Sequence, residues 1–258
     1  AIDREELNES VYFGRAKPRQ YTVLKSSKYY KPEFEKAYIE YNPDKTKDLL
    51  DEIGLEDQDG DGWRELPNGK DFNFTIEYVD RVTPKAPNVE LVIEYWKDVG
   101  IDVNAKQISA ELQRQRAPAN MMDCTIWNGD KATDILFPRA AQFFVPQPPG
   151  WERTIWPKWG RWLTTDGDSG EEPPAQIKEL YNIWEEMIEE PDADRRIELG
   201  KEIAQMQADN LWVIGTIGEA PQPLIINKNL GNVPEDGLFV WDTLYTMRYD
   251  PEQFYFKQ

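Results

Sequence analysis

The chain has 258 residues, of which 40% are hydrophobic and 30% charged, so it can bury a core and does not have the composition of a disordered protein. Its net charge of −18 gives a surface that repels nucleic acid phosphates and anionic lipids. The absence of histidine excludes histidine-dependent nucleophiles and histidine-ligated zinc, and the single cysteine, Cys124, excludes an internal disulfide.

The first quarter of the chain predicts two helices. One is predicted over residues 3–11, and residues 15–40 are predicted to be irregular and anchored by aromatic side chains. Asn42 is a favourable N-cap and Pro43 suits a first helical turn, so a second helix is predicted to begin there. Its apolar residues recur at helical spacing up to Gly54, where we expect the helix to end.

An acidic turn follows this second helix. Asp57, Asp59 and Asp61 occupy the first, third and fifth positions of an EF-hand calcium loop, and Gly62 occupies the sixth. The twelfth position, where that loop has a bidentate glutamate, is Asn68. Two interpretations remain open, a calcium site that lacks its strongest ligand and a solvated turn whose residues suit tight backbone geometry. No other cofactor is expected.

The middle of the chain alternates strands and helices. Residues 72–78 alternate apolar and polar side chains, which predicts a half-buried strand. An amphipathic helix over residues 89–96 and an alternating strand over residues 101–105 complete a βαβ unit, whose strands should be parallel. A helix over residues 110–117 and a strand over residues 122–127 are predicted next.

The strand at residues 122–127 leads into a long segment that is predicted to be irregular and rich in tryptophan. Loops of this length are uncommon unless they are functional or disordered, and ligands bind outside the carboxyl ends of strands in α/β domains. A ligand site and a loop folded onto its own core are therefore both open. The tryptophans from the strand to the end of this segment are Trp127, Trp151, Trp156, Trp159 and Trp162.

Two further helices are predicted, one after Pro174 and one that begins at Asp192 or Asp194, each with an apolar stripe opposite an acidic face. A buried strand is predicted over residues 211–217 and a short one over residues 224–226. The tail from Pro234 is predicted to be irregular and aromatic.

Motifs for phosphate loops, dinucleotide binding and metalloproteases are absent from the sequence. Carboxylate pairs such as Asp166 with Asp168, or Glu171 with Glu172, suit a glycoside hydrolase, although so acidic a chain contains such pairs by chance. A hydrolase and a non-transport interaction domain are therefore kept as alternative functions.

Five stretches point to a family. The chain begins with AIDREE, residues 41–54 read YNPDKTKDLLDEIG, and residues 95–103 read YWKDVGIDV. Residues 122–127 read MDCTIW, and residues 194–196 read DRR ahead of Gln205, Asp209 and Asn210. In this order the stretches resemble segments of the family 5 extracellular solute-binding proteins, the oligopeptide and dipeptide receptors of bacterial ABC importers.

The resemblance implies an α/β, type II periplasmic-binding-protein fold. Residues 1–215 would form its C-terminal ligand-binding lobe, a mixed sheet flanked by helices. Residues 216–258 would cross a hinge and return towards an N-terminal lobe that is missing from this sequence. Side chains that pack on that lobe are expected to form an exposed apolar patch.

The resemblance also implies a function without catalysis. The protein would be the substrate-binding subunit of an ABC importer, acting in the periplasm or outside the cell and held at the membrane by the transporter or by a lipid anchor. Its expected partners are an oligosaccharide or oligopeptide, the membrane permease and the N-terminal lobe, but no nucleic acid.

The ligand class depends on few residues. In the peptide receptors an aspartate shortly after the strand's tryptophan binds the peptide amino terminus, and Asp130 and Asp134 compete for that position here. The segment with Trp159, Trp162 and GEEPP at residues 170–174 is similar to members among which oligosaccharide binders occur, and tryptophan faces suit sugar rings. We favour an oligosaccharide over a peptide. The predicted ligand contacts are Trp127, Asn128, Asp130, Trp156 and Trp159, with core packing as the alternative role of each tryptophan.

Overall fold

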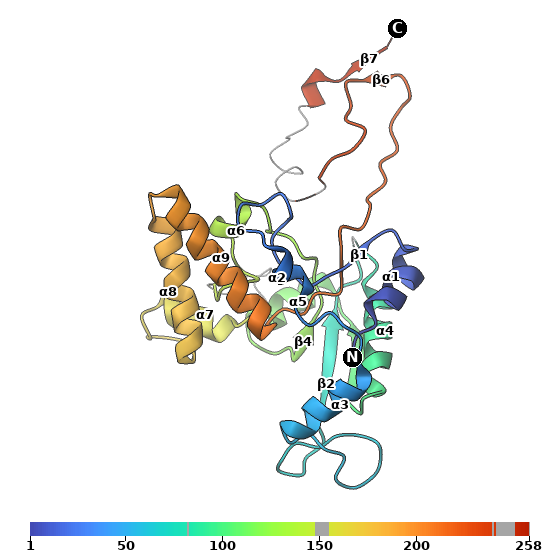
Figure 1. Ribbon diagram of the computed structural model, residues 1–258, viewed down its shortest axis with the longest axis vertical. Coiled ribbons are helices and arrows are strands. Elements are labelled where there is room, and N and C mark those ends of the chain that lie inside the picture. The colour runs from blue at the N-terminus through green and yellow to red at the C-terminus, as the bar shows by residue number, and fades with distance from the viewer. Residues whose placement is uncertain (82, 148–154, 239, 241–250, 258) are drawn as a thin grey trace.

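The computed structural model of the chain is shown in Figure 1 and describes residues 1–81, 83–147, 155–238, 240 and 251–257. A small parallel sheet with its helices occupies one side of the body, and a group of helices occupies the other. An extended segment leaves the body and reaches a pair of two-residue antiparallel strands beyond it (Figure 1). None of the described helices has the length and apolar character of a membrane span.

The parallel sheet confirms the predicted βαβ unit. Its central strand is β2 (Asn73–Tyr78), which pairs in parallel with β3 (Asp102–Gln107) along its whole length. The crossover helix α4 (Lys85–Lys97) joins these two strands. On the other side of β2 lies β4 (Cys124–Thr125), also parallel, which is shorter than the strand predicted over residues 122–127.

The two faces of β2 are covered differently. Ile76 and Tyr78 pack against Val89 and Ile93 of α4, as the alternation predicts. The opposite face was expected to be polar and open, yet Glu77 is only 3% exposed. Arg116, the last residue of the helix α5 (Ala110–Arg116), pairs with it, and its Nε lies 2.8 Å from Glu77 Oε2.

The elements before the sheet are short. The helix α1 (Arg4–Tyr12) is capped by the Asp3 side chain, and α3 (Pro43–Glu52) by Asn42, whose side chain accepts a hydrogen bond from Lys45 N. Both helices were predicted. The stretch predicted to be irregular between them also contains β1 (Lys17–Pro18) and α2 (Pro32–Lys36). No residue of α3 is buried, so its apolar stripe faces outward.

The helical side of the body is built on two helices, α8 (Ala175–Glu189) and α9 (Ala193–Asn210), which lie side by side in Figure 1. Leu180, Met187 and Ile203 are fully buried between them and the rest of the core. Each such side chain contributes about 1.5–3 kcal/mol by leaving water. Both helices were predicted, and α9 begins after Asp192, whose side chain caps it.

The segment predicted to be irregular between residues 128 and 162 contains two helices, α6 (Leu136–Arg139) and α7 (Pro157–Thr164). Residues 141–147 are buried, and the main apolar cluster includes Phe137 of α6 together with Ala141, Phe143, Phe144 and Val145. Gly160 lets α7 touch the backbone at Gln147, because an added Cβ would lie 1.9 Å from the Gln147 carbonyl oxygen. The described parts of this segment, residues 128–147 and 155–162, thus pack against the core.

The strand predicted over residues 211–217 is wrong for most of its length. Leu211 has a φ of 47° and ends α9 in the left-handed conformation. Gly215 then passes close to the backbone of Tyr21, so these residues cross that segment rather than joining the sheet. Only β5 (Ile217–Gly218) is a strand, and it pairs antiparallel with β1.

The strand predicted over residues 224–226 is also wrong. Leu224, Ile225 and Ile226 have no regular structure and are 76%, 101% and 51% exposed, so they form an apolar run in solvent. Beyond them, β6 (Leu230–Gly231) pairs antiparallel with β7 (Tyr255–Phe256), which follows the 3-10 turn η1 (Pro251–Gln253). The predicted aromatic tail lies partly outside the described residues, at positions 239 and 241–250.

Candidate ligand-binding site

The carboxyl edge of the sheet brings together residues that are distant in the sequence. Trp127 and Asn128 follow β4, and Thr83 lies in the connection that follows β2. Because β2 and β4 are parallel neighbours, both connections emerge at the same edge. The Thr83 hydroxyl donates a hydrogen bond to Asn128 Oδ1 over 2.9 Å, which joins the two connections.

Lys85 underlies this edge and was not predicted as a site residue. Its side chain is nearly inaccessible, at 2% exposed, and its Nζ donates to the Arg81 carbonyl oxygen at 2.7 Å and to Thr83 Oγ1 at 3.3 Å. The same Nζ lies 5.5 Å from the centre of the Trp127 ring. Burial lowers the pKa of Lys85, while the charge of Asp80 opposes that shift.

The turn after Asn128 is held against the core by Tyr21. The Tyr21 hydroxyl donates to the main-chain carbonyl of Asp130 over 2.8 Å. Gly129 packs closely against the Tyr21 ring, since an added Cβ would be 2.9 Å from Tyr21 Cδ2. Burial, reinforced by the charge of Asp130, raises the pKa of Tyr21 well above its ordinary value. The predicted contact Asp130 therefore sits in a turn whose backbone is fixed.

Asp134, which competes with Asp130 as the predicted amino-terminus anchor, has local partners. Its Oδ1 accepts hydrogen bonds from Ser27 Oγ at 2.6 Å and from Lys28 N at 2.9 Å. These bonds tie the stretch before α6 to the loop at residues 27–28. A ligand ammonium at Asp134 would meet a carboxylate whose Oδ1 already accepts from two donors.

Trp156 and Trp159 form an aromatic group with Trp212, which was not singled out in the sequence. The ring centres of Trp156 and Trp159 are 5.7 Å apart, and Trp212 meets Trp156 edge-on at 5.3 Å. All three are partly buried, and they and Trp127 pack against the same apolar cluster. The core-packing role is thus met by all of them, and their role as ligand contacts stays a prediction.

The other tryptophans of the long segment fall elsewhere. Trp162 is partly buried, and the Lys178 ammonium lies 4.8 Å from its ring centre. Trp151 lies outside the described residues. Two small hollows, of about 70 Å³ beside Cys124 and about 180 Å³ beside Asp57, contain neither Trp127 nor Asn128. The candidate site is accordingly an edge and not one of these cavities.

The acidic turn forms a second cluster of ligand-like atoms. Carboxylate oxygens of Asp57, Asp59, Asp61 and Glu65 all lie within 4.8 Å of one another. Glu65 is 7% exposed and was missed, because the EF-hand comparison places the acidic ligand at position 68. Asn68 instead accepts a hydrogen bond from Lys70 N. Its side chain thus stabilises its own turn.

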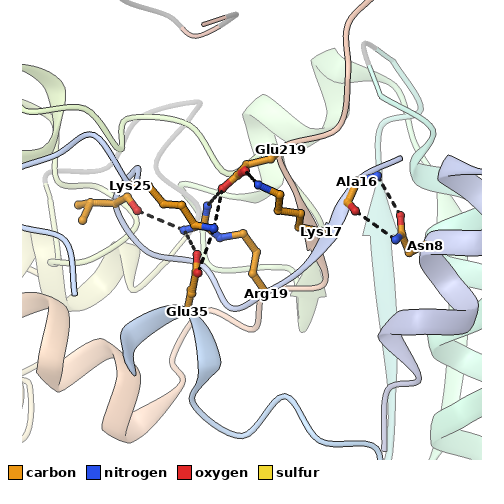
Figure 2. A network of polar contacts seen from close by, with 8 residues as sticks. Asn8, Ala16, Lys17, Arg19, Lys25, Glu35 and Glu219 are labelled. Carbon is orange, nitrogen blue, oxygen red and sulfur yellow. Dashed lines mark hydrogen bonds and ion pairs between the residues drawn. The ribbon is translucent and has the colours of Figure 1, made fainter. Parts of the chain in front are cut away.

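Figure 2 shows an ion-pair network where the extended segment leaves the body. Glu219, directly after β5, pairs with Lys17 and, at 3.0 Å, with Arg19 Nη1. Arg19 also pairs with Glu35 of α2 at 3.3 Å, and Lys25 approaches both carboxylates. The side chains of Arg19 and Glu35 are only 8% and 10% exposed. The network fixes the point at which the extended segment begins.

Residues 1–140 match the family model described as bacterial extracellular solute-binding proteins, family 5 Middle. The chain is 26% identical over 257 residues to the periplasmic alpha-galactoside-binding protein of Rhizobium meliloti (strain 1021), an alignment that covers 96% of this chain and 36% of that protein. The chain therefore spans little more than a third of that relative.

Solved structures share the fold. An oligopeptide-binding protein OppA is 33% identical with a TM-score of 0.77, and the match covers all of this chain and 42% of that one. The periplasmic binding protein MelB of agrobacterium fabrum C58, solved in complex with stachyose, has a TM-score of 0.72 at 22% identity, covering 90% of this chain and 34% of that one. The predicted type II periplasmic-binding-protein fold is thus confirmed.

Proposed function

The chain belongs to family 5 of the bacterial extracellular solute-binding proteins, and on this basis we propose that it is the ligand-binding lobe of a receptor serving an ABC importer. The observation that carries the proposal is the carboxyl edge of the parallel sheet, where Trp127 and Asn128 are held by contacts from a neighbouring connection. Proteins of this family and the structural neighbours bind solutes and are not described as enzymes.

The proposed ligand is an oligosaccharide. Support comes from the α-galactoside-binding relative, which aligns along 96% of the chain. Trp127, Trp156 and Trp159 offer aromatic faces, and Asn128 offers a neutral polar group, which together suit the faces and hydroxyls of sugar rings. The ligand contacts proposed are these four residues and Asp130.

A peptide is the second candidate, because the OppA structure is 33% identical and its name describes a peptide binder. Asp130 or Asp134 would then bind the peptide amino terminus. Asp134 is the weaker choice of the two, since Ser27 and Lys28 already donate to its Oδ1.

A catalytic role is not part of the proposal. The acidic pairs considered for a hydrolase lie on the surface, where Glu171 pairs with Lys158 and Glu172 pairs with Lys178. Asp166 and Asp168 are exposed as well. A glycosidase acid needs a raised pKa in a sheltered site, and these exposed carboxylates have no such shelter.

In the complete receptor, residues 1–215 form one lobe and residues 216–258 cross to an N-terminal lobe, and ligand capture closes the two. The chain's coverage of only 36% of its relative supports this proposal, as does the apolar run at residues 224–226, which a second lobe would cover. The closed receptor would then deliver its ligand to the permease, held at the extracytoplasmic face by the transporter or by a lipid anchor.

The acidic turn is proposed to bind calcium. Oxygens that each lie about 2.3–2.6 Å from a shared calcium ion are at most about 5 Å apart, and the four carboxylates meet this condition. Calcium would stabilise the turn that joins α3 to β2, without touching the ligand edge.

The calcium proposal predicts that millimolar calcium raises the melting temperature and that EDTA reverses the rise. Asp59→Asn should remove most of this response, because it replaces one anionic ligand, while the matched change Asp48→Asn on the exposed face of α3 should retain it. Differential scanning calorimetry with and without calcium measures the melting temperature of each variant. An equal response in the two variants, or none in the wild type, would contradict a site at this turn.

The ligand proposal is tested by titrating the full-length receptor with stachyose, cello- and manno-oligosaccharides and short peptides. Tryptophan fluorescence and the melting temperature report binding. A ligand at about 100 times its Kd should stabilise the receptor by roughly 2.7 kcal/mol. We expect a response to a neutral sugar and none to peptides. A peptide response with silent sugars would replace the oligosaccharide by the peptide candidate.

A further inference from the structure

The polar chain behind Trp127 has a defined direction. The Lys85 ammonium has donors only, so at 3.3 Å from Thr83 Oγ1 it must donate and the hydroxyl must accept. The hydroxyl's single hydrogen is then available for Asn128 Oδ1, 2.9 Å away. Lys85, Thr83 and Asn128 therefore form a one-way chain of hydrogen bonds that begins at a buried cation.

The direction of the chain fixes the orientation of the Asn128 amide. Its carbonyl oxygen is held by Thr83, so its NH2 group points away from that bond. Within the described part of the chain, the Asn128 Nδ2 has no hydrogen-bond partner. Asn128 is half-buried and adjacent to Trp127, so these two amide hydrogens are presented beside an aromatic side chain.

We propose that Lys85 is a positioning residue that, through Thr83, presents Asn128 to the ligand as a hydrogen-bond donor. The inference rests on the proposed function and narrows the ligand chemistry. The atom recognised beside Trp127 is an acceptor oxygen, as in the hydroxyl or ring oxygen of a neutral sugar. A peptide ammonium, which can only donate, does not fit this position.

Electrostatics at the same edge favour the same ligand class. The Lys85 cation lies 5.5 Å from the Trp127 ring centre on one side of the indole. A ligand cation near that ring would meet a like charge in a poorly solvated setting, where repulsion is larger than in water. Asp80 accepts from the main-chain nitrogens of Lys85 and Ala86, so its carboxylate holds the start of α4.

The test measures ligand affinity of the full-length receptor by titration calorimetry. Stachyose is the first ligand, and cello- and manno-oligosaccharides are further probes. Asn128→Asp keeps an acceptor for Thr83 but removes the donors, and Thr83→Val breaks the chain without changing the side-chain shape. Lys85→Met removes the cation and keeps the aliphatic stem. Each variant should lose about tenfold in affinity, the size of one net hydrogen bond.

Two matched changes separate positioning from general damage. Thr83→Ser keeps the hydroxyl and should restore near wild-type affinity, which a purely structural loss at position 83 would not do. Lys97→Met, on the exposed end of α4, should bind as the wild type does. Melting temperatures measured without ligand identify any variant that has failed to fold.

The outcomes distinguish the inference from the function on which it rests. If the wild type binds a sugar and Asn128→Asp and Thr83→Val bind it equally well, the inference is overturned while the receptor function stands. If the wild type binds only peptides, the neutral-sugar ligand is overturned. Binding of neither class would overturn the proposed function and this inference together.

Discussion

Glu219 concentrates several contacts on one carboxylate. Lys17 and Arg19 donate to it, Lys25 lies 3.7 Å away, and its own backbone has a φ of 53° (Figure 2). A left-handed conformation is uncommon for a residue other than glycine and persists only where the surroundings stabilise it. The ion pairs supply that stabilisation at the residue where the extended segment begins.

The network predicts a dependence of stability on pH. Burial by itself raises the pKa of Glu219, but the hydrogen bond and charge of Lys17, with the charges of Lys25 and Arg19, bring it below the ordinary value of 4.5. A lowered folded pKa contributes stability that is present above about pH 4.5 and is lost as the pH falls through the folded value.

Glu219→Gln should therefore lower the free energy of unfolding near neutral pH, and its difference from the wild type should shrink as the pH falls below 4.5. Urea unfolding between about pH 3 and 7 measures this. Glu235→Gln, an exposed change further along the same segment, serves as the control. A difference that stays constant across this range would show that the carboxylate charge is not what stabilises the network.

Single residues also show where prediction from the sequence fails. Trp127 and Asn128 could be placed at the carboxyl edge because they directly follow an apolar strand. Lys85 could not, because a lysine near the start of a helix is ordinarily solvated. Its burial depends on β4 lying beside β2, and strand order is a property of the fold that no local pattern contains. Trp212 was missed because it lay inside a wrongly predicted strand.

Among the elements, α7 depends on a glycine for its position. Gly160 approaches the Gln147 carbonyl so closely that a Cβ would overlap it at 1.9 Å. The contact holds α7, and with it Trp159, against the buried residues 141–147.

Gly160→Ala should therefore destabilise the protein by about 1–3 kcal/mol through overpacking, although alanine favours helix by up to about 1 kcal/mol. It should also weaken ligand binding in the full-length receptor by displacing Trp159. Urea unfolding and titration measure the two effects, with Arg161→Ala on the exposed side of the same helix as the control. A stabilised Gly160→Ala protein would show that α7 is free to shift without cost.

The helices α3, α4, α8 and α9 were predictable because their signals are local, such as the N-caps Asn42 and Asp192 and the apolar spacing of each. The strand predicted over residues 211–217 failed for the opposite reason. An apolar run predicts burial, but a strand also needs a partner, and close packing at Gly215 leaves room for pairing only at Ile217–Gly218. The two-residue strands β1, β6 and β7 have no detectable pattern of their own.

At the scale of the whole molecule, the chain combines a net charge of −18 with the exposed apolar run at residues 224–226. Charge repulsion keeps copies of the chain apart, whereas exposed apolar side chains on a segment that pairs with no strand favour association. Salt weakens only the first effect, because the Debye length falls from about 30 Å at 0.01 M to about 3 Å at 1 M.

This chain is therefore expected to self-associate more strongly as salt increases, and Ile225→Asp should reduce that tendency. Light scattering or sedimentation over this range of salt measures it. Ile135→Asp, at an exposed apolar residue on the body of the protein, should change it little. Equal association of the two variants would show that copies associate through a surface other than residues 224–226.

The extended segment after Glu219 has a further consequence. Residues 221–229 are all exposed, and residues 221–226 have neither helix nor strand structure. Proteases bind their substrates as accessible, extended chain, and local opening costs least where few contacts must be broken. A brief digestion should thus cut here before anywhere in the body, leaving an intact core that ends near the Glu219 ion pairs.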